Sequence, residues 1–203
     1  MSKIDFWDFS AIFYDLAMKA NGRAYGEMLK FIGDIVPVGA TVLEAAAGTG
    51  ATSIAVSDKA SSILCTDISE KMLNVARRKV KKRRIKNIEI ANRSIYDLKE
   101  ADSSFDMVIA GHVLHLIDEP HKAATELRRV AKSMVILPIS FTKNLRGMTK
   151  FKMSIYRLFG FAPCIELAKD EYADFLSGLG FEGCEITHID GNVPMAVAIY
   201  NVQ

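Results

Sequence analysis

The chain has 203 residues, of which half are hydrophobic and a quarter are charged, and its formal net charge is only +2. This composition suits one globular domain and argues against a disordered chain. The N-terminus lacks an apolar stretch of signal-peptide length, and no stretch approaches the about 18 apolar residues of a spanning helix. The three cysteines, Cys65, Cys164 and Cys184, lack metal-binding spacing and favour a reduced, cytoplasmic setting.

The first two thirds of the chain alternate between strand and helix patterns. Two helices are predicted first, over 6–20 and 24–36, and we expect residues 1–37 to form an N-terminal helical cap. The predicted elements that follow are strand 40–45, helix 51–59, strand 61–67, helix 69–83, strand 88–93, strand 105–111, helix 121–132 and strand 134–140. Ser69 is the expected N-cap of the long helix. Such alternation predicts a parallel sheet with helices on both faces.

The C-terminal end departs from this alternation. A helix over 169–180 ends in glycine, and strands 181–189 and 193–202 flank the turn-forming stretch "DGN". The two strands should form a hairpin, so the last strand should run antiparallel to its neighbour. We therefore expect a single α/β domain over 1–203, whose sheet has about seven strands.

The segment 141–165 is too long for a plain connection between strand and helix. It combines an apolar stripe that includes Phe151 and Phe159 with basic residues such as Lys150 and Arg157. It follows the fifth strand on the edge where ligands bind in such sheets. We expect a helical lid over a substrate site, and the alternatives are a dimer contact and a membrane-surface helix.

The first strand ends in the stretch "VLEAAAGTG", residues 42–50. Gly48 and Gly50 would let a ligand approach the backbone, because a side chain would push it away. A dinucleotide is disfavoured because Ser53 stands where the pyrophosphate fingerprint needs its third glycine. The carboxylate of Glu44 instead favours a ligand with positive charge. The alternative reading is a tight turn between strand and helix.

Asp67 ends the second predicted strand, 23 positions after Glu44. A carboxylate at that edge can accept hydrogen bonds from both hydroxyls of a ribose. The alternative reading is a helix cap or turn residue.

The ordered stretches "VLEAAAGTG", "CTDISEKMLNVARRK" and "SFDMVIAGHVLHLIDEPHKAATELRRV" resemble the class I S-adenosylmethionine-dependent methyltransferases over about residues 40–137. The similarity is greatest to the ubiquinone/menaquinone-biosynthesis branch, which acts on small molecules. It implies a Rossmann-like seven-stranded sheet and S-adenosylmethionine as cofactor. The cofactor-binding residues that it implies are Tyr14, Glu44, Ala46, Gly48, Gly50, Asp67, Ile68, Ser94, Ile95 and Gly111.

Three positions depart from the family pattern. Ala46 replaces a common glycine, and its methyl group can be tolerated if φ stays negative. Ser94 stands where relatives often have aspartate, and the usual Pro-Gly-Gly turn before the fifth strand is absent.

Two histidines, His112 and His115, follow the fourth strand in "GHVLHL". Either imidazole can take a proton from an acceptor group. The alternative reading is that His115 packs beneath the sheet edge and His112 only shapes the pocket. No base is obligatory, because the sulfonium already activates the methyl group and alignment can suffice.

The run "RRKVKKRRIK", residues 77–86, holds eight basic residues in ten positions. Its lack of interleaved aromatic residues favours a solvated helix face over nucleic-acid binding. The sequence therefore predicts a cytoplasmic methyltransferase acting on a small molecule, as a monomer or homodimer, with no metal. The alternatives are a non-catalytic S-adenosylmethionine-binding protein and a nicotinamide-dependent oxidoreductase.

Overall fold

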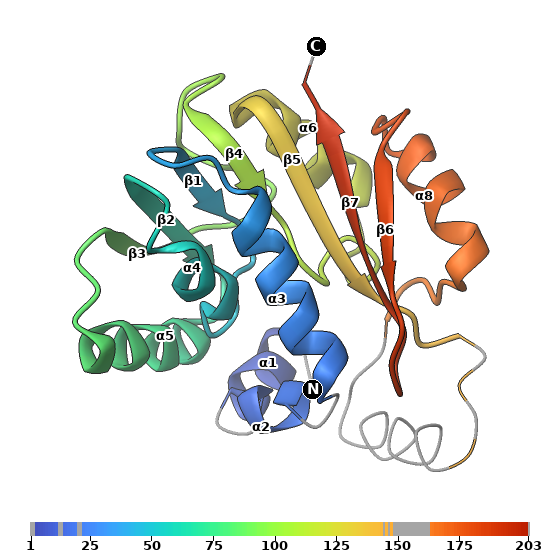
Figure 1. Ribbon diagram of the computed structural model, residues 1–203, viewed down its shortest axis with the longest axis horizontal. Helices are drawn as coiled ribbons and strands as arrows, with labels where there is room; N and C mark the ends of the chain where they lie inside the picture. Colours follow the sequence, from blue (N-terminus) through green and yellow to red (C-terminus); the bar gives the residue numbers. More distant parts are fainter. Residues whose placement is uncertain are drawn as a thin grey trace.

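The computed structural model describes residues 3–11, 14–19, 22–143, 145, 147 and 163–202, and its centre is a seven-stranded sheet (Figure 1). The strand order is β3-β2-β1-β4-β5-β7-β6. The strands are β1 Thr41–Glu44, β2 Ser62–Asp67, β3 Ile88–Asn92, β4 Phe105–Ile109, β5 Ala131–Ser140, β6 Glu185–Ile189 and β7 Met195–Asn201. β1 to β5 pair in parallel, and β7 is antiparallel to both β5 and β6. The predicted fold class, including the antiparallel last strand, is confirmed.

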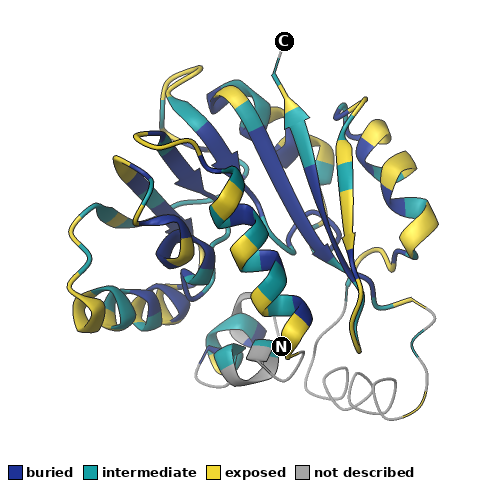
Figure 2. Cartoon of the chain, viewed as in Figure 1, coloured by how far each residue is buried: buried dark blue, intermediate teal, exposed yellow. Residues whose placement is uncertain are grey.

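Helices cover both faces of the sheet, because consecutive strand residues point to opposite sides. Val42 of β1 packs with Met28 and Ile32 on one face, and the next residue, Leu43, packs with Leu127 on the other. The helical elements are α1 Lys3–Ser10, α2 Tyr14–Lys19, α3 Arg23–Ile35, α4 Ala51–Val56, α5 Glu70–Arg83, α6 Pro120–Val130, the 3-10 turn Lys169–Glu171 and α8 Tyr172–Gly178. Figure 2 shows that the central strands form the buried interior between these layers.

The N-terminal region differs from the single helix predicted over 6–20. The structure has two short helices there, α1 and α2, with Ala11 in a turn. The hydroxyl of Ser10 donates to the carbonyl oxygen of Trp7 at 3.1 Å, which is a side-chain bond that competes with continued helix. Both helices lie below the carboxyl ends of the central strands (Figure 1).

The register brings the ends of three strands to one edge. Glu44, the last residue of β1, pairs with Cys65 of β2 and Ile109 of β4. Loops that carry the predicted site residues therefore leave the sheet side by side. Most of the segment 141–165, for which a lid was predicted, lies outside the described residues. No helix in the described part of the chain is long and apolar enough to cross a membrane.

Candidate functional site

The loop after β1 folds back on itself through three left-handed residues. Ala46, Gly48 and Gly50 have φ values of 53°, 54° and 69°. The loop is fixed to both neighbouring strands, because the amide of Ala45 donates to Ile109 at 2.9 Å and that of Ala47 donates to Thr66 at 2.8 Å. The backbone of residues 45–50 thus forms a compact loop at the carboxyl edge of the sheet, which we call the glycine ledge.

Ala46 does not meet the condition under which its methyl group was expected to be tolerated. That condition was a negative φ, whereas the structure gives Ala46 a positive φ of 53°. An alanine in this region costs about 1–2 kcal/mol relative to a glycine. The chain therefore keeps a methyl group on the pocket wall at the expense of local strain.

The two glycines of the loop differ in what lies beside them. A Cβ on Gly48 would meet Tyr14 Cε1 at 3.9 Å and Met72 Sδ at 4.0 Å, both pocket-lining residues. A Cβ on Gly50 would meet Ala76 Cβ at 3.2 Å and Cys65 Sγ at 3.4 Å, between α5 and β2. Gly48 thus borders the pocket, whereas Gly50 allows close packing behind it. A side chain at Gly50 would therefore press on Ala76 and Cys65 instead of projecting only toward a ligand.

Asp67 holds the loop and the next helix together. Its Oδ2 accepts from the amide of Gly48 at 2.8 Å and its Oδ1 accepts from the amide of Ser69 at 2.8 Å. Burial raises the pKa of this carboxyl group, while the backbone donors oppose that rise. Ser69 in turn caps α5, as predicted, by accepting from Met72 at 3.2 Å. Asp67 lines the pocket, so each oxygen keeps a lone pair that a ligand hydroxyl can use.

Glu44 does not line the pocket. Its carboxylate is buried at 4% exposure and accepts from the amide of Ser53 at 2.7 Å and from the Ser53 hydroxyl. Burial raises the pKa of Glu44, although the hydrogen bonds from Ser53 and Thr52 lower it again. Glu44 therefore fixes the start of α4 behind the loop.

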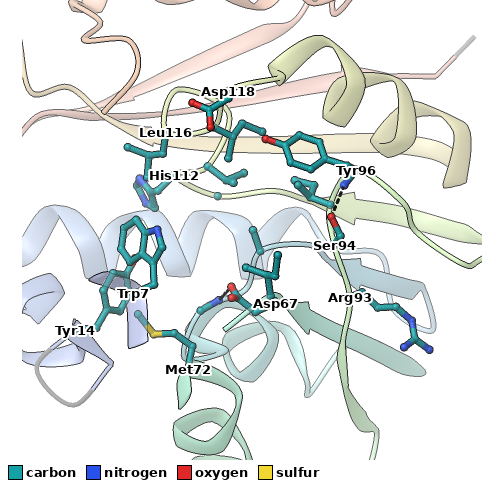
Figure 3. A pocket seen from close by; sticks show the side chains of 17 residues that line it. Trp7, Tyr14, Asp67, Met72, Arg93, Ser94, Tyr96, His112, Leu116 and Asp118 are labelled. Carbon is teal, nitrogen blue, oxygen red and sulfur yellow. Dashed lines mark hydrogen bonds between the residues drawn. The ribbon is translucent and has the colours of Figure 1, made fainter. Parts of the chain in front are cut away.

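A cavity of about 450 Å³ opens beside this loop (Figure 3). Its lining residues come from α1 and α2, from the carboxyl ends of β1 to β4 and the loops that follow them, and from α5. They are Trp7, Tyr14, Ala46, Gly48, Asp67, Ile68, Met72, Arg93, Ser94, Ile95, Tyr96, Gly111, His112, Val113, Leu116, Ile117 and Asp118. Of the predicted site residues, this wall includes Tyr14, Ala46, Gly48, Asp67, Ile68, Ser94, Ile95, Gly111 and His112. Glu44, Gly50 and His115 lie elsewhere.

Polar contacts join α1 and α2 to α5 and to the loop after β1. Asp15 accepts from Lys79 of α5 at 2.9 Å and from the Thr49 hydroxyl of the loop at 2.5 Å. The Ser69 hydroxyl donates to Asp8 of α1 at 2.6 Å. These bonds place Trp7 and Tyr14 on the wall.

The rings of Trp7 and Tyr14 meet edge to face with centroids 6.2 Å apart. Burial and nearby carboxylates raise the pKa of Tyr14, so its hydroxyl stays protonated. Sequence reasoning missed Trp7. The aromatic stretch "FWDF" was its only local signal, and nothing in it says which strand edge the ring will face.

His112 carries two signs of a functional position. It has a positive φ of 55°, which is uncommon for a residue other than glycine. Its Nε2 is buried and has no hydrogen-bond partner among the described residues. Burial lowers the pKa of His112 to about 4, so the ring is neutral at pH 7. Figure 3 shows the imidazole on the cavity wall beside Trp7 and Leu116.

His115 occupies a different environment. It is 6% exposed and borders a small hollow beneath the sheet edge with Tyr172 and Pro138. Burial, together with nearby His112, lowers the pKa of His115 to about 3. The location agrees with packing beneath the edge, which was one of the two readings of this residue.

Part of this chain is similar in sequence to known methyltransferases. Residues 43–137 match the family model described as a methyltransferase domain. A demethylmenaquinone methyltransferase from Clavibacter sepedonicus is 36% identical over 99 residues, which cover 48% of this chain and 40% of that protein. The chain thus spans less than half the length of the curated relatives it matches first.

Two solved structures share the fold over nearly the whole chain. The putative methyltransferase complexed with the Trm112 methyltransferase activator, from Haloferax volcanii, has a TM-score of 0.77 at 16% identity, covering 99% of this chain and 97% of that one. A Thermotoga maritima S-adenosylmethionine-dependent methyltransferase, titled a possible histamine N-methyltransferase, has a TM-score of 0.74 at 16% identity, covering 98% and 99%. The resemblance to class I methyltransferases in sequence and fold is confirmed.

Proposed function

We propose that this chain, which has the class I methyltransferase fold, transfers a methyl group from S-adenosylmethionine to a small-molecule acceptor. The observation that carries the proposal is one cavity in which the glycine ledge and Asp67 lie opposite the polar edge of His112. Its volume of about 450 Å³ is typical of small-molecule and cofactor sites. S-adenosylmethionine supplies an activated methyl group when bound.

The residues present fit that cofactor. A Cβ on Gly48 would project toward Tyr14 and Met72. Because glycine lacks a Cβ, the bare backbone at this position is available to a ligand. In the proposal, Asp67 accepts from the ribose hydroxyls while keeping its bonds to the backbone. Ile68, Ser94 and Ile95 border the adenine. Ala46, Gly48 and Gly111 border the methionine portion.

Other residues contribute indirectly. Glu44 and Gly50 position the ledge from behind, and Glu44 adds negative charge close to the site. The proposal leaves His115 a packing role. Trp7 and Tyr14 exclude water from the cofactor and hold the acceptor close to it, so that alignment contributes much of the rate.

The proposal gives His112 the role of receiving a hydrogen bond from the acceptor. A neutral ring with an unpartnered Nε2 suits this role, and a protonated ring would repel the sulfonium. Because burial holds the pKa of His112 near 4, its ring signals in an NMR titration should not shift between pH 8 and 5.5. A midpoint near the ordinary value of about 6.5 would contradict the role.

Calorimetric titration with S-adenosylmethionine and S-adenosylhomocysteine tests the proposal as a whole. Binding should be measurable for both, and each should raise the melting temperature by linkage. The same titration with NADH should give no heat beyond dilution. Binding of NADH alone would favour the oxidoreductase reading. Cofactor binding without turnover of a pooled acceptor library would favour the non-catalytic binding protein.

A further inference from the structure

The described basic side chains fall into two groups. Six basic side chains have no ion pair, side-chain hydrogen bond or ring contact with any described residue, and we call them the basic cluster. They are Arg78, Lys81, Lys82, Arg83, Arg84 and Lys86. Every other Lys or Arg whose side chain is described contacts a carboxylate, a carbonyl oxygen or an aromatic ring. Among the side chains that the structure describes, the unpaired cations are therefore confined to the basic cluster.

The position of the basic cluster is not explained by helix stability alone. Cations in the last turn of α5 interact favourably with the helix dipole, which accounts for Lys81, Lys82 and Arg83. Arg78 lies more than a turn before the helix end, and Lys86 lies beyond it. Arg78 and Lys82 also share the outward face with Lys71, opposite the buried residues of α5, since seven or eleven residues are close to whole turns.

Exposed apolar side chains lie near the N-terminal end of α5, opposite the end with the basic cluster. Phe9 is 55% and Ile68 is 48% exposed, and they are two of only four large hydrophobic residues that are exposed in the described chain. Ile68 immediately precedes α5, and Phe9 follows Asp8, which bonds to the N-cap Ser69. One 14-residue helix, about 21 Å long, therefore lies between the basic cluster and these apolar side chains. Ile68 both lines the cavity and is exposed, so we call its surroundings the pocket rim.

We propose that α5 and the pocket rim dock on an anionic membrane surface. Stable attachment to a bilayer generally needs two signals, and basic residues together with exposed apolar groups provide them. The stretch 77–86 contains no aromatic residue, so base stacking on nucleic acid has no platform there. The docking surface does not depend on the proposed methyl transfer, and it would bring the pocket rim to the bilayer.

Co-sedimentation with vesicles of phosphatidylcholine containing about 30 mol % phosphatidylserine tests the docking surface at about 0.1 M salt. The whole chain should pellet with these vesicles and not with pure phosphatidylcholine. The triple variant Arg78→Gln, Lys82→Gln, Lys86→Gln should partition at least about tenfold less, because each cation near an anionic surface contributes separately. Phe9→Ser should lower the partition by a smaller factor.

The matched control removes three cations that lie outside α5 and each pair with a carboxylate. Lys30→Gln, Lys99→Gln, Lys132→Gln makes the same charge change and should pellet like the original chain. Circular dichroism melts establish that both triple variants are folded. The proposal is overturned if the original chain fails to pellet, or if both triple variants lose binding equally. It is also overturned if a single-stranded oligonucleotide displaces the protein from vesicles at equal phosphate concentration, which would assign the surface to nucleic acid.

Discussion

Leucine at Gly50 should unfold the chain or lower its stability severely, whereas alanine at Gly48 should leave it folded and weaken cofactor binding. At Gly50, the positive φ of 69° costs about 1–2 kcal/mol for any side chain. The added side chain also enters the contact between Ala76 and Cys65, where overpacking costs about 1–3 kcal/mol more. Together these cost about 2–5 kcal/mol, a large part of the about 5–15 kcal/mol by which many domains are stable.

Gly48 has looser surroundings than Gly50. A Cβ finds nothing closer than 3.9 Å, so Gly48→Ala should lose only the strain of about 1–2 kcal/mol. Its methyl group, however, stands on the pocket wall, and affinity for S-adenosylmethionine should fall at least about tenfold. Denaturant unfolding and calorimetric titration on both variants separate the effects. Normal affinity in Gly48→Ala would show that the ledge does not contact the cofactor.

Removing the carboxylate of Asp67 should damage both the loop and the cofactor site. Asp67→Ala leaves the amides of Gly48 and Ser69 without their acceptor, and each buried unsatisfied donor costs about 1–3 kcal/mol. Loss of the bonds proposed to the ribose should also weaken S-adenosylmethionine binding by about 1–3 kcal/mol. Affinity must be measured where the variant is demonstrably folded.

The variant Asp67→Asn provides the control for Asp67→Ala. Its one side-chain oxygen can keep only one of the two backbone bonds, so its stability should lie between those of the other two proteins. If Asp67→Ala binds S-adenosylmethionine with unchanged affinity, Asp67 acts in the fold alone and the ribose assignment fails.

The sequence predicted those features that depend on local pattern. Strand–helix alternation and the "DGN" turn predicted the sheet and its antiparallel end. The acid at the end of a strand located Asp67 at the right edge, because parallel strands place their carboxyl ends together.

Other features depend on contacts between distant parts of the chain. No local pattern reveals that Gly50 faces Ala76, or that Asp15 meets Lys79, 64 positions away. The positive φ at Ala46 could not be predicted either, since residue type alone favours the opposite sign. Such packing decides which side of a loop meets the ligand. The different roles of Gly48 and Gly50 could therefore be assigned only from the structure.

The polar contacts that join α1 and α2 to the rest of the chain affect the rate of ligand exchange as well as the shape of the cavity. Trp7 and Tyr14 border the cavity from α1 and α2, and these helices are joined to α5 and to the glycine loop through Asp8 and Asp15. If a bulky ligand enters past the cap, the polar contacts must separate and reform with each passage. The speed of exchange is then set by local opening of the protein rather than by diffusion. Tight binding and slow release would in that case arise from the same few side-chain contacts.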